Sequence, residues 1–304
     1  MRIGASLRSA YPGVEAHTGA RWMIERARAA RAAGFDSLFV GDHHATGPVP
    51  YYQNVPILGR LLAEWSDATA GVLMLLPLWD PVLAAEQLGT LAAIHSGPFV
   101  LQCAIGGGEA QFAALGRDLR QRPSRFEASL DVVRRLLAGD EVTMERPYRI
   151  TAARIAPVIP DPLEVWIGAS APAAIDRAAR LGNAFLIGPE ATPADARELI
   201  DAYRQACDRH GRPVGRIAIR RDVHVGADDA ELDRVARPIV DAGYRGFDPA
   251  APVVGTTVAV EAAFAELAVI GCTDVIVRHL AEDHAAVLAS FDRLGTVRAT
   301  IADL

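Results

Sequence analysis

Gly34-Phe-Asp-Ser-Leu-Phe-Val-Gly-Asp-His-His44 joins the end of one structural element to the whole of the next. Its first residue follows a stretch rich in Arg and Ala and suits the position just after a helix. Residues 37–40 form a short, mostly apolar run, which is typical of a buried strand. The triplet Asp42-His43-His44 then stands at the carboxyl end of that strand. In a parallel barrel this end carries the chemistry, so the segment predicts a fold and a site together.

The same alternation of strand and helix runs through the rest of the chain. We predict eight strands, at residues 3–7, 37–40, 72–76, 99–105, 165–168, 184–187, 217–225 and 274–277. We predict a helix after each of them, at residues 21–33, 55–68, 81–95, 125–137, 172–181, 193–210, 258–270 and 283–294. Eight such units in order predict an α/β fold of the (β/α)8 TIM barrel type, because parallel strands with right-handed crossovers close on themselves. An open doubly wound sheet is the alternative, but no Gly-x-Gly-x-x-Gly motif follows the first strand.

Two stretches interrupt this rhythm. Residues 140–160 suggest a short hairpin or loop before the fifth strand. Residues 226–257 form an insertion after strand 7 that is too long for a plain connector. An insertion at the top of a barrel suits a lid or a substrate wall. Because no linker or shift of composition divides the chain, we expect a single domain over residues 1–304.

Composition predicts an ordinary enzyme. Of the 304 residues 51% are hydrophobic, and one barrel with insertions needs a chain of this size, typically about 250 residues or more. No apolar run reaches the ~18 residues of a membrane span, and the first residues lack the architecture of a signal peptide. The net charge of −6, without a basic stripe interleaved with aromatics, argues against nucleic-acid binding. Three widely spaced cysteines suggest free thiols in a reducing cytoplasm.

The chain has no lysine, so all 31 basic residues counted as Lys or Arg are arginines. A Schiff-base lysine, a pyridoxal anchor and a phosphate-loop lysine are therefore excluded. An anionic cofactor has to be held by Arg side chains, hydroxyls, backbone amides or helix N-termini.

Three further groups of residues stand where strands are predicted to end. Asp42 beside two imidazoles can orient a tautomer, hold a proton or ligate a metal. Gly106-Gly107-Gly108 let a flat ligand approach the backbone, and Glu109 after them is either a general acid or a helix-start acid. Gly168, Ser170 and Ala171 open a helix and suit a phosphate, unless Ser170 is a plain N-cap. Arg278 after the last strand can add positive charge for an anion.

A metal site is the alternative reading of the histidine pair. Zinc needs further His, Asp or Glu ligands at other strand ends, and only Asp222, His224 and His279 are candidates. Without a second compact ligand pair we assign no metal ligand. A metal-dependent hydrolase that uses Asp42, His43, His44 and Asp222 remains the more distant alternative.

Several segments taken together resemble the luciferase-like monooxygenase family, which includes bacterial luciferase and coenzyme F420-dependent reductases and dehydrogenases. The similar segments are residues 34–44, 72–81, 84–97, 99–116, 165–182 and 254–257. The resemblance runs nearly from end to end, and the order of the pieces is more specific than any one of them. It implies a barrel whose C-terminal mouth holds a flavin or deazaflavin.

The resemblance also implies roles for single residues. His43 matches the active-site histidine of the family, and Glu109 matches an acid that some deazaflavin sugar-phosphate dehydrogenases use. Ser170 and Ala171 fall where the cofactor phosphate is usually bound. The cofactor ring is expected to rest against a bulge at Val72-Leu73, where relatives often carry a non-proline cis peptide.

We therefore assign His43 and Glu109 to catalysis. Residues assigned to cofactor binding are Asp42, Val72, Leu73, Gly106, Gly107, Gly108, Gly168, Ser170 and Ala171. The cofactor is expected to be coenzyme F420 or FMN. Luciferase-type members often have Arg near the end of the fourth strand to hold the FMN phosphate, whereas this chain has Ile105. This departure favours F420.

The predicted function is that of a cytoplasmic oxidoreductase which transfers hydride between F420 and a small organic substrate. The alternative is an FMN-dependent two-component monooxygenase, which uses reduced flavin and O2 and is served by a separate flavin reductase. We expect a homodimer, formed through the helices that follow the second and third predicted strands. We expect neither a nucleic-acid nor a membrane partner. A barrel that only stores or binds a flavin is a further alternative.

Overall fold

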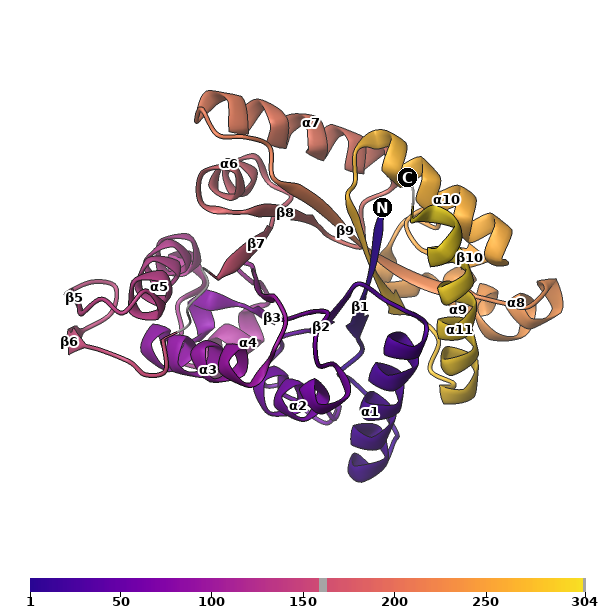
Figure 1. Ribbon diagram of the computed structural model, residues 1–304, viewed down its shortest axis with the longest axis horizontal. Helices are drawn as coiled ribbons and strands as arrows, with labels where there is room; N and C mark the ends of the chain where they lie inside the picture. Colours follow the sequence, from indigo (N-terminus) through magenta and orange to yellow (C-terminus); the bar gives the residue numbers. More distant parts are fainter. Residues whose placement is uncertain (159–162, 303–304) are drawn as a thin grey trace. The chain divides into compact units, whose positions relative to one another are not determined.

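The computed structural model describes residues 1–158 and 163–302 (Figure 1). The chain divides into two compact units, which we describe one after the other. The first consists of Met1–Arg8, Glu15–Phe39 and Trp166–Leu304, and the second of Ser9–Val14 and Val40–Val165. Residues 159 and 160, the end of the predicted hairpin region, lie outside the described residues.

The first unit is built on parallel strands. They are β1 (Arg2–Leu7), β2 (Ser37–Val40), β7 (Glu164–Gly168), β8 (Ala184–Ile187), β9 (Arg216–Val225), β10 (Val253–Gly255) and β11 (Asp274–His279). Strand β11 pairs in parallel with β1 and with β9, which also pairs with β8 and β10. Apolar side chains of these strands, such as Ile3 and Ile219, are fully buried. Strand β8 is apolar throughout, as expected where both faces of a parallel sheet are covered, whereas β9 also carries Arg220, Arg221 and Asp222.

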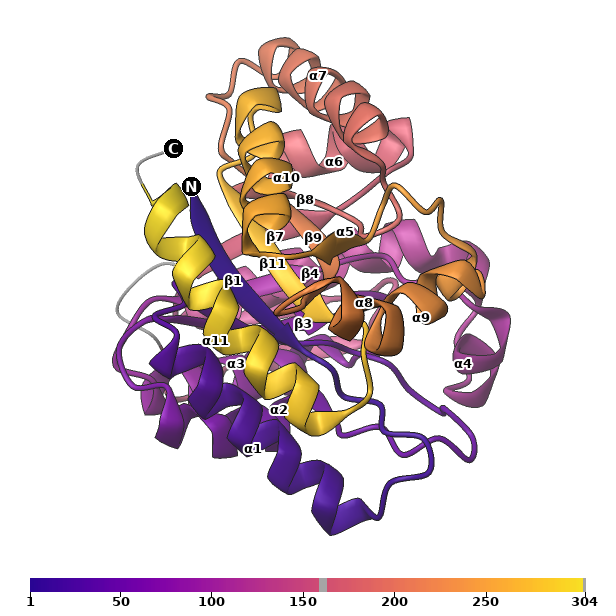
Figure 2. The ribbon, with the colours of Figure 1, turned by 90° about the vertical axis from the view of Figure 1, so that its right-hand side faces the viewer.

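The helices of the first unit follow its strands. They are α1 (Ala16–Ala32), α6 (Pro172–Leu181), α7 (Pro193–Arg209), α10 (Thr257–Ile270) and α11 (His284–Ile301). Helix α1 packs on α11, and α6 packs on α7, as Figure 2 shows. Helix α1 was predicted to start at residue 21, but it starts five residues earlier, at Ala16. The reason is that the Glu15 carboxylate caps it by accepting hydrogen bonds from the amides of His17 and Thr18.

The insertion after β9 belongs to the first unit. It contains α8 (Asp229–Val235), α9 (Arg237–Asp241), the 3-10 turn η4 (Tyr244–Gly246) and the short strand β10. Strand β10 extends the sheet beside β9, with Gly255 opposite Val225. The predicted insertion after the seventh barrel strand is therefore present, and it is structured throughout its length.

The second unit contains the parallel strands β3 (Thr69–Met74) and β4 (Phe99–Cys103). Its helical elements are α2 (Asn54–Leu61), η1 (Leu62–Glu64), η2 (Leu76–Leu78), α3 (Pro81–Ile94), α4 (Glu109–Ala114), η3 (Leu119–Gln121) and α5 (Arg122–Leu137). Strands β5 (Val142–Met144) and β6 (Ile150–Ala153) form the antiparallel hairpin expected before the fifth barrel strand. No helix of the described residues is both long enough and apolar enough to cross a membrane.

The expected bulge in the third strand is absent. Val72 lies opposite Leu101 and Leu73 opposite Gln102, in one unbroken parallel register with β4. Among the described residues the cis peptide bonds are Arg146-Pro147 and Ala156-Pro157, so the expected cis bond at Val72-Leu73 is wrong. The chain leaves extended geometry only after Met74, where η2 begins at Leu76.

Candidate active site

Asp42 is the buried centre of the group at the end of β2. Its Oδ2 accepts a hydrogen bond of 2.8 Å from the amide of Leu75 and another of 2.8 Å from Nε1 of Trp79. Both donors belong to the segment that follows β3. Oδ2 of this buried carboxylate is therefore satisfied by donors of the protein itself.

His44 completes this arrangement. Its Nε2 lies 3.1 Å from Oδ1 of Asp42, and its ring meets that of Trp79 edge-on at 5.6 Å. The hydrogen bond to Asp42 raises the pKa of His44 above its ordinary value and outweighs the opposing effect of burial. The residue two positions after Asp42 is thus the one that pairs with it, as the alternation of extended backbone allows.

His43 points elsewhere, and its side chain is exposed. Its ring lies 5.8 Å from that of Tyr51, and its carbonyl accepts a hydrogen bond of 3.2 Å from the Gln53 side chain. An exposed imidazole beside a tyrosine can exchange protons with a bound molecule. His43 and His44 therefore face different surroundings.

The glycine loop after β4 is held by two side chains. Arg122 donates to the carbonyl of Gly106 at 3.1 Å, and the Gln111 side-chain amide donates to the carbonyl of Gly107. Gly106 and Gly108 have φ values of 69° and 84°, a conformation that favours glycine. Glu109, the first residue of α4, is exposed. The sequence analysis did not single out Gln111, although this residue lies in the first turn of α4, directly after the glycine run.

The other predicted cofactor residues occupy two places. Val72 is fully buried in β3 and Leu73 is half-buried, and the carbonyl of Leu73 accepts a hydrogen bond of 2.7 Å from the Asn54 amide. In the first unit Gly168 ends β7, and Ser170 is exposed just before α6. Ala171 is the N-cap of α6, and no side chain caps that terminus. Pro172 has no N–H and the amide of Ala174 donates to the carbonyl of Ala171, so Ala173 supplies the helical amide that is left to bind an anion at this end.

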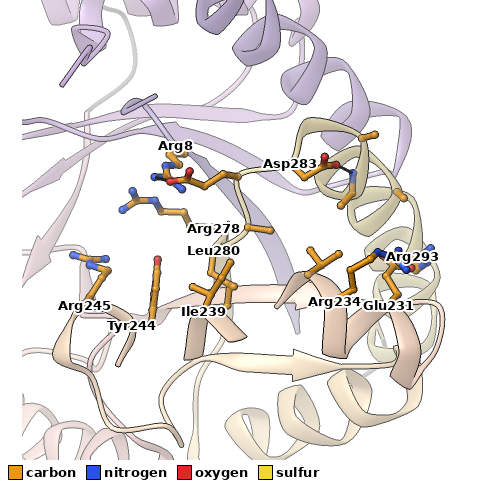
Figure 3. A pocket seen from close by; sticks show the side chains of 16 residues that line it. Arg8, Glu231, Arg234, Ile239, Tyr244, Arg245, Arg278, Leu280, Asp283 and Arg293 are labelled. Atoms are coloured by element: carbon orange, nitrogen blue, oxygen red, sulfur yellow. Dashed lines mark hydrogen bonds and ion pairs between the residues drawn. The ribbon is translucent and has the colours of Figure 1, made fainter. Parts of the chain in front are cut away.

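A cavity of about 960 Å³ opens in the first unit, between the insertion and the start of α11 (Figure 3). Arg8 and Arg278 enter it from the ends of β1 and β11, whereas Tyr244 and Arg245 enter it from η4. Its charged lining residues are Arg8, Arg234, Arg245, Arg278, Arg293, Glu231, Glu282 and Asp283. Arginines thus outnumber acids on its walls.

Two of these arginines are neutralised by acids of the same cavity. Arg8 pairs with Glu282 at 2.6 Å, and Arg293 pairs with Glu231 at 2.9 Å. The Nε of Arg278, by contrast, is buried without a hydrogen-bond partner among the described residues. A guanidinium with an unsatisfied N–H beside a hollow rich in arginine favours an anionic ligand.

Asp222 on β9 lies behind the cavity and is fully buried. Its Oδ2 accepts hydrogen bonds of 2.9 Å from the Tyr244 hydroxyl and 3.1 Å from Arg245, and Arg220 lies 3.4 Å from Oδ1. Burial acts to raise the pKa of Asp222, but the surrounding guanidiniums, led by Arg220, outweigh it and lower the pKa. Burial also lowers the pKa of Arg220 to about 10.

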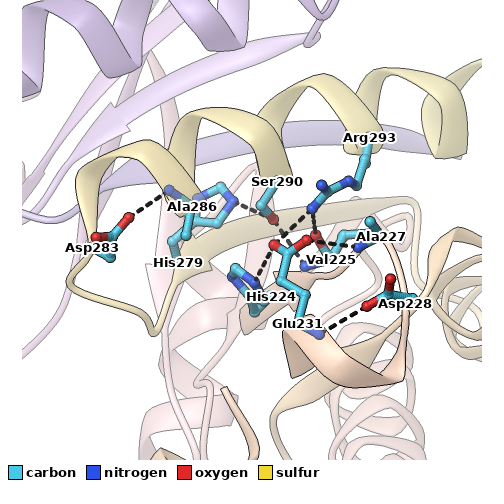
Figure 4. Close-up of polar contacts among 10 residues, drawn as sticks. All are labelled: His224, Val225, Ala227, Asp228, Glu231, His279, Asp283, Ala286, Ser290 and Arg293. Atoms are coloured by element: carbon cyan, nitrogen blue, oxygen red, sulfur yellow. Dashed lines mark hydrogen bonds and ion pairs between the residues drawn. The ribbon is translucent and has the colours of Figure 1, made fainter. Parts of the chain in front are cut away.

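His224 and His279, named above as possible metal ligands, belong to a buried polar network beneath α11 (Figure 4). Nε2 of His279 lies 2.9 Å from the Ser290 hydroxyl, which also accepts from the amide of Val225. His224 lies 3.4 Å from Glu231. Burial lowers the pKa of both histidines.

The described residues contain no group of three or more His, Cys, Asp or Glu side chains that could hold a metal ion. Asp42 and Asp222 also each satisfy neighbouring donors of their own unit. The geometry therefore gives the metal-dependent hydrolase no ligand set in this part of the chain.

Known proteins with similar sequences include two F420-dependent glucose-6-phosphate dehydrogenases. An F420-dependent glucose-6-phosphate dehydrogenase of Nakamurella multipartita is 28% identical over 233 residues, which are 73% of this chain and 68% of that protein. A protein of the same name from Beutenbergia cavernae is 33% identical over 184 residues, 56% of this chain and 52% of its own length. The second match thus spans about half of that relative.

Solved structures show the fold. The monooxygenase RslO1 of Streptomyces bottropensis has a TM-score of 0.85 at 19% identity, with 99% of both chains covered. The oxygenating component of 3,6-diketocamphane monooxygenase from Pseudomonas putida, solved with FMN, has a TM-score of 0.79 at 16% identity, again with 99% of both chains covered. The fold is therefore the predicted TIM barrel.

A family assignment follows from the sequence match itself. The model of the luciferase-like monooxygenase family matches residues 1–286, which is nearly the whole chain. The predicted resemblance is confirmed, and this chain belongs to the luciferase-like monooxygenase family.

Proposed function

We propose that the chain is an oxidoreductase that uses coenzyme F420 or FMN, and that its favoured reaction is hydride transfer between F420 and a small organic substrate. The observation that carries this proposal is the exposed His43, which stands at the end of β2 beside the buried carboxylate of Asp42, whose Oδ2 accepts two hydrogen bonds. The names of the two relatives, both F420-dependent dehydrogenases, support F420. The absence of an arginine at Ile105 supports the same choice.

The residues fit such a cofactor. A Cβ added to Gly107 would meet only the Arg122 side chain, at 3.7 Å, so a planar ring can approach this backbone. Leu73 leaves part of its side chain accessible on β3. The uncapped N-terminus of α6, with Ser170 before it, suits a phosphate. In the second unit Val72, Gly106 and Gly108 remain proposed as cofactor contacts, and in the first unit Gly168 and Ala171. Asp42 was assigned to cofactor binding from the sequence.

The bound cofactor supplies hydride chemistry as a deazaflavin, or oxygen chemistry as a reduced flavin. The chain's own part is to bind, to exclude water and to move a proton. His43 is placed to hold or release that proton at an exposed ring nitrogen, and Glu109 is the second exposed candidate. In the oxygen-using alternative a separate flavin reductase supplies the reduced cofactor.

We infer that the substrate carries an anionic group. The arginine-rich cavity supports this, because Arg278 and Arg245 face a hollow whose acids are fewer than its arginines. The relative's substrate, glucose 6-phosphate, has such a group. A phosphate or carboxylate fits the planar fork of a guanidinium.

We propose a homodimer that forms through α2 and α3, the helices after the second and third strands, which both belong to the second compact unit. Leu83 and Ile94 on α3 are more than half exposed, and a shallow groove between α2 and α3 is lined in part by Val55, Pro56 and Leu91. Cytoplasmic location is proposed because Cys103, Cys207 and Cys272 are buried free thiols. We also propose that residues 1–304 form a single domain, which the family match over residues 1–286 supports.

The test is a binding titration of the purified chain with F420 and with FMN, each oxidised and reduced, followed by fluorescence and absorbance. The proposal expects saturable binding of F420 and weaker binding of FMN. Tight binding of reduced FMN alone would favour the monooxygenase. Failure to bind either cofactor would overturn the proposal.

A further inference from the structure

Asp42 pairs with His44 and also joins two other segments of the second unit. The two hydrogen bonds of Asp42 reach Leu75 and Trp79, which flank η2 after β3. These donors rest on an apolar cluster of Leu75, Leu78 and Phe112, with Trp79 packed against it. One carboxylate thus fastens the chain after β2 to the chain after β3.

Gln111 makes the second connection. Its Oε1 accepts a hydrogen bond of 3.4 Å from the amide of His44, and its Nε2 donates to the carbonyl of Gly107. The Gln111 side chain is almost completely buried. One amide side chain therefore fastens the segment after β2 to the glycine loop after β4.

His43 lies between these two anchored residues in the sequence, yet its own side chain is exposed. Its neighbours on both sides are buried or half-buried and hydrogen-bonded. Its backbone is therefore fixed by contacts that its own side chain does not make. Misplacement of a catalytic group by about 1 Å costs on the order of 100-fold in rate, so such anchors matter for chemistry.

We propose that Asp42, His44 and Gln111 are positioning residues, which fix the backbone of His43 against the segments after β3 and β4. The sequence alone assigned Asp42 to cofactor binding. In this proposal Asp42 acts through its neighbours instead and does not contact the cofactor. His44 serves as the cationic partner of the Asp42 carboxylate. The consequence for catalysis rests on the proposed function, whereas the Asp42–His44 pair itself does not.

The first test needs no cofactor. Histidine labelled with ¹³C and ¹⁵N allows each imidazole to be titrated by NMR, and His44→Gln identifies the His44 signal. The proposal expects His44 to titrate above the ordinary histidine value, and expects Asp42→Asn to lower its midpoint. The matched control is Asp118→Asn, because Asp118 is an acid of the same unit whose contacts are with Arg120. An unchanged midpoint in Asp42→Asn would overturn the pair.

The second test separates positioning from simple loss of structure. His44→Gln keeps an N–H donor for Asp42 without the charge, whereas His44→Phe removes both. We expect turnover in the Gln variant to exceed that in His44→Phe and to lose the pH dependence that residue 44 gives the wild type. In His44→Phe and Gln111→Leu we expect turnover to fall by about tenfold or more, with KM changed little.

Each outcome bears on a different claim. Equal pH profiles in the wild type and His44→Gln, together with normal turnover in His44→Phe and Gln111→Leu, would overturn the positioning role. If the wild type binds neither F420 nor FMN, the proposed function fails, while the NMR midpoint of His44 still decides whether Asp42 holds it.

Discussion

The Tyr244 hydroxyl donates a hydrogen bond of 2.9 Å to the buried carboxylate of Asp222, so the sheet holds the tip of the insertion directly. Tyr244 stands in η4, and Asp222 lies inside β9, the strand from which the insertion departs. Arg245, at φ 54°, shares the same carboxylate. One acid thereby fixes two adjacent lining residues of the cavity, both of which belong to η4.

Loss of this bond should loosen the cavity. Tyr244→Phe removes the hydroxyl and leaves Asp222 with one donor fewer, so we expect a loss of about 1–2 kcal/mol in the free energy of unfolding. Urea denaturation measures this loss. Tyr203→Phe is a poor control because Tyr203 is buried, whereas Tyr52→Phe alters a half-buried tyrosine of the other unit. No change in Tyr244→Phe would mean that the bond does not hold the insertion.

Arg278 should recognise the anionic group of the substrate. In Arg278→Gln we expect the affinity for inorganic phosphate or a sugar phosphate to fall by about tenfold or more, because hydrogen bonds to charged groups contribute roughly 1.5–3 kcal/mol. Isothermal titration calorimetry at two salt concentrations measures the change. Arg120→Gln is the control, since the Arg120 side chain is 91% exposed and pairs with Asp118. Equal losses in both variants would indicate nonspecific charge.

His43 should carry proton transfer. We expect His43→Ala to lower turnover by about 10²–10⁴-fold, the usual contribution of a general acid or base, while cofactor binding stays within a few-fold of the wild type. Steady-state kinetics and the binding titration measure the two effects separately. Turnover that survives in His43→Ala but fails in Glu109→Gln would transfer the role to Glu109.

Stability should depend on pH through the buried histidines. The folded pKa values of His224 and His279 are lowered by burial, so the folded state prefers both rings neutral. Their contribution is present above the ordinary histidine value near 6.5 and is lost as the pH falls through that value towards their folded pKa.

His44 acts in the opposite sense. Its pKa is raised in the folded state, so its contribution to stability is full below 6.5 and is lost as the pH rises through the folded pKa.

Thermal unfolding between pH 4.5 and 8.5 tests the contribution of the buried histidines. Stability should fall on the acid side, and His279→Gln should reduce this fall. A loss on the acid side that neither His279→Gln nor His224→Gln alters would contradict the assignment.

Ile94 should contribute to self-association. Its side chain is 58% exposed on α3, and we expect Ile94→Glu to weaken a dimer without unfolding the chain. Analytical ultracentrifugation measures the dissociation constant. Val269→Glu on α10 is the matched control, because Val269 is 82% exposed in the other unit. If the wild type sediments as a monomer, the proposed dimer is wrong.

The sequence predicted best where local chemistry determines structure. Strand β2 and helix α6 have the predicted bounds, because a short apolar run between turn residues and a Pro at the first helical position are strong local signals. Strand β4 ends two residues earlier than predicted, at Cys103. Apolar character alone could not show where the glycine run takes the chain out of the sheet.

The site was harder to predict because its contacts join segments that are distant in sequence. Asp42 meets Trp79 across 37 positions, and Gln111 meets His44 across 67. No spacing rule links such pairs. The arginine cavity was missed for the same reason, apart from Arg278, since Arg8 and Arg245 converge only in the fold.

The most direct test of the central claim is reduction of F420 by a panel of phosphorylated and carboxylated alcohols, followed by absorbance in the wild type and in His43→Ala. We expect at least one anionic alcohol to reduce F420 in the wild type, and we expect His43→Ala to bind F420 without reducing it. F420 that remains oxidised with every substrate, while reduced FMN and O2 are consumed by the same protein, would contradict the central claim.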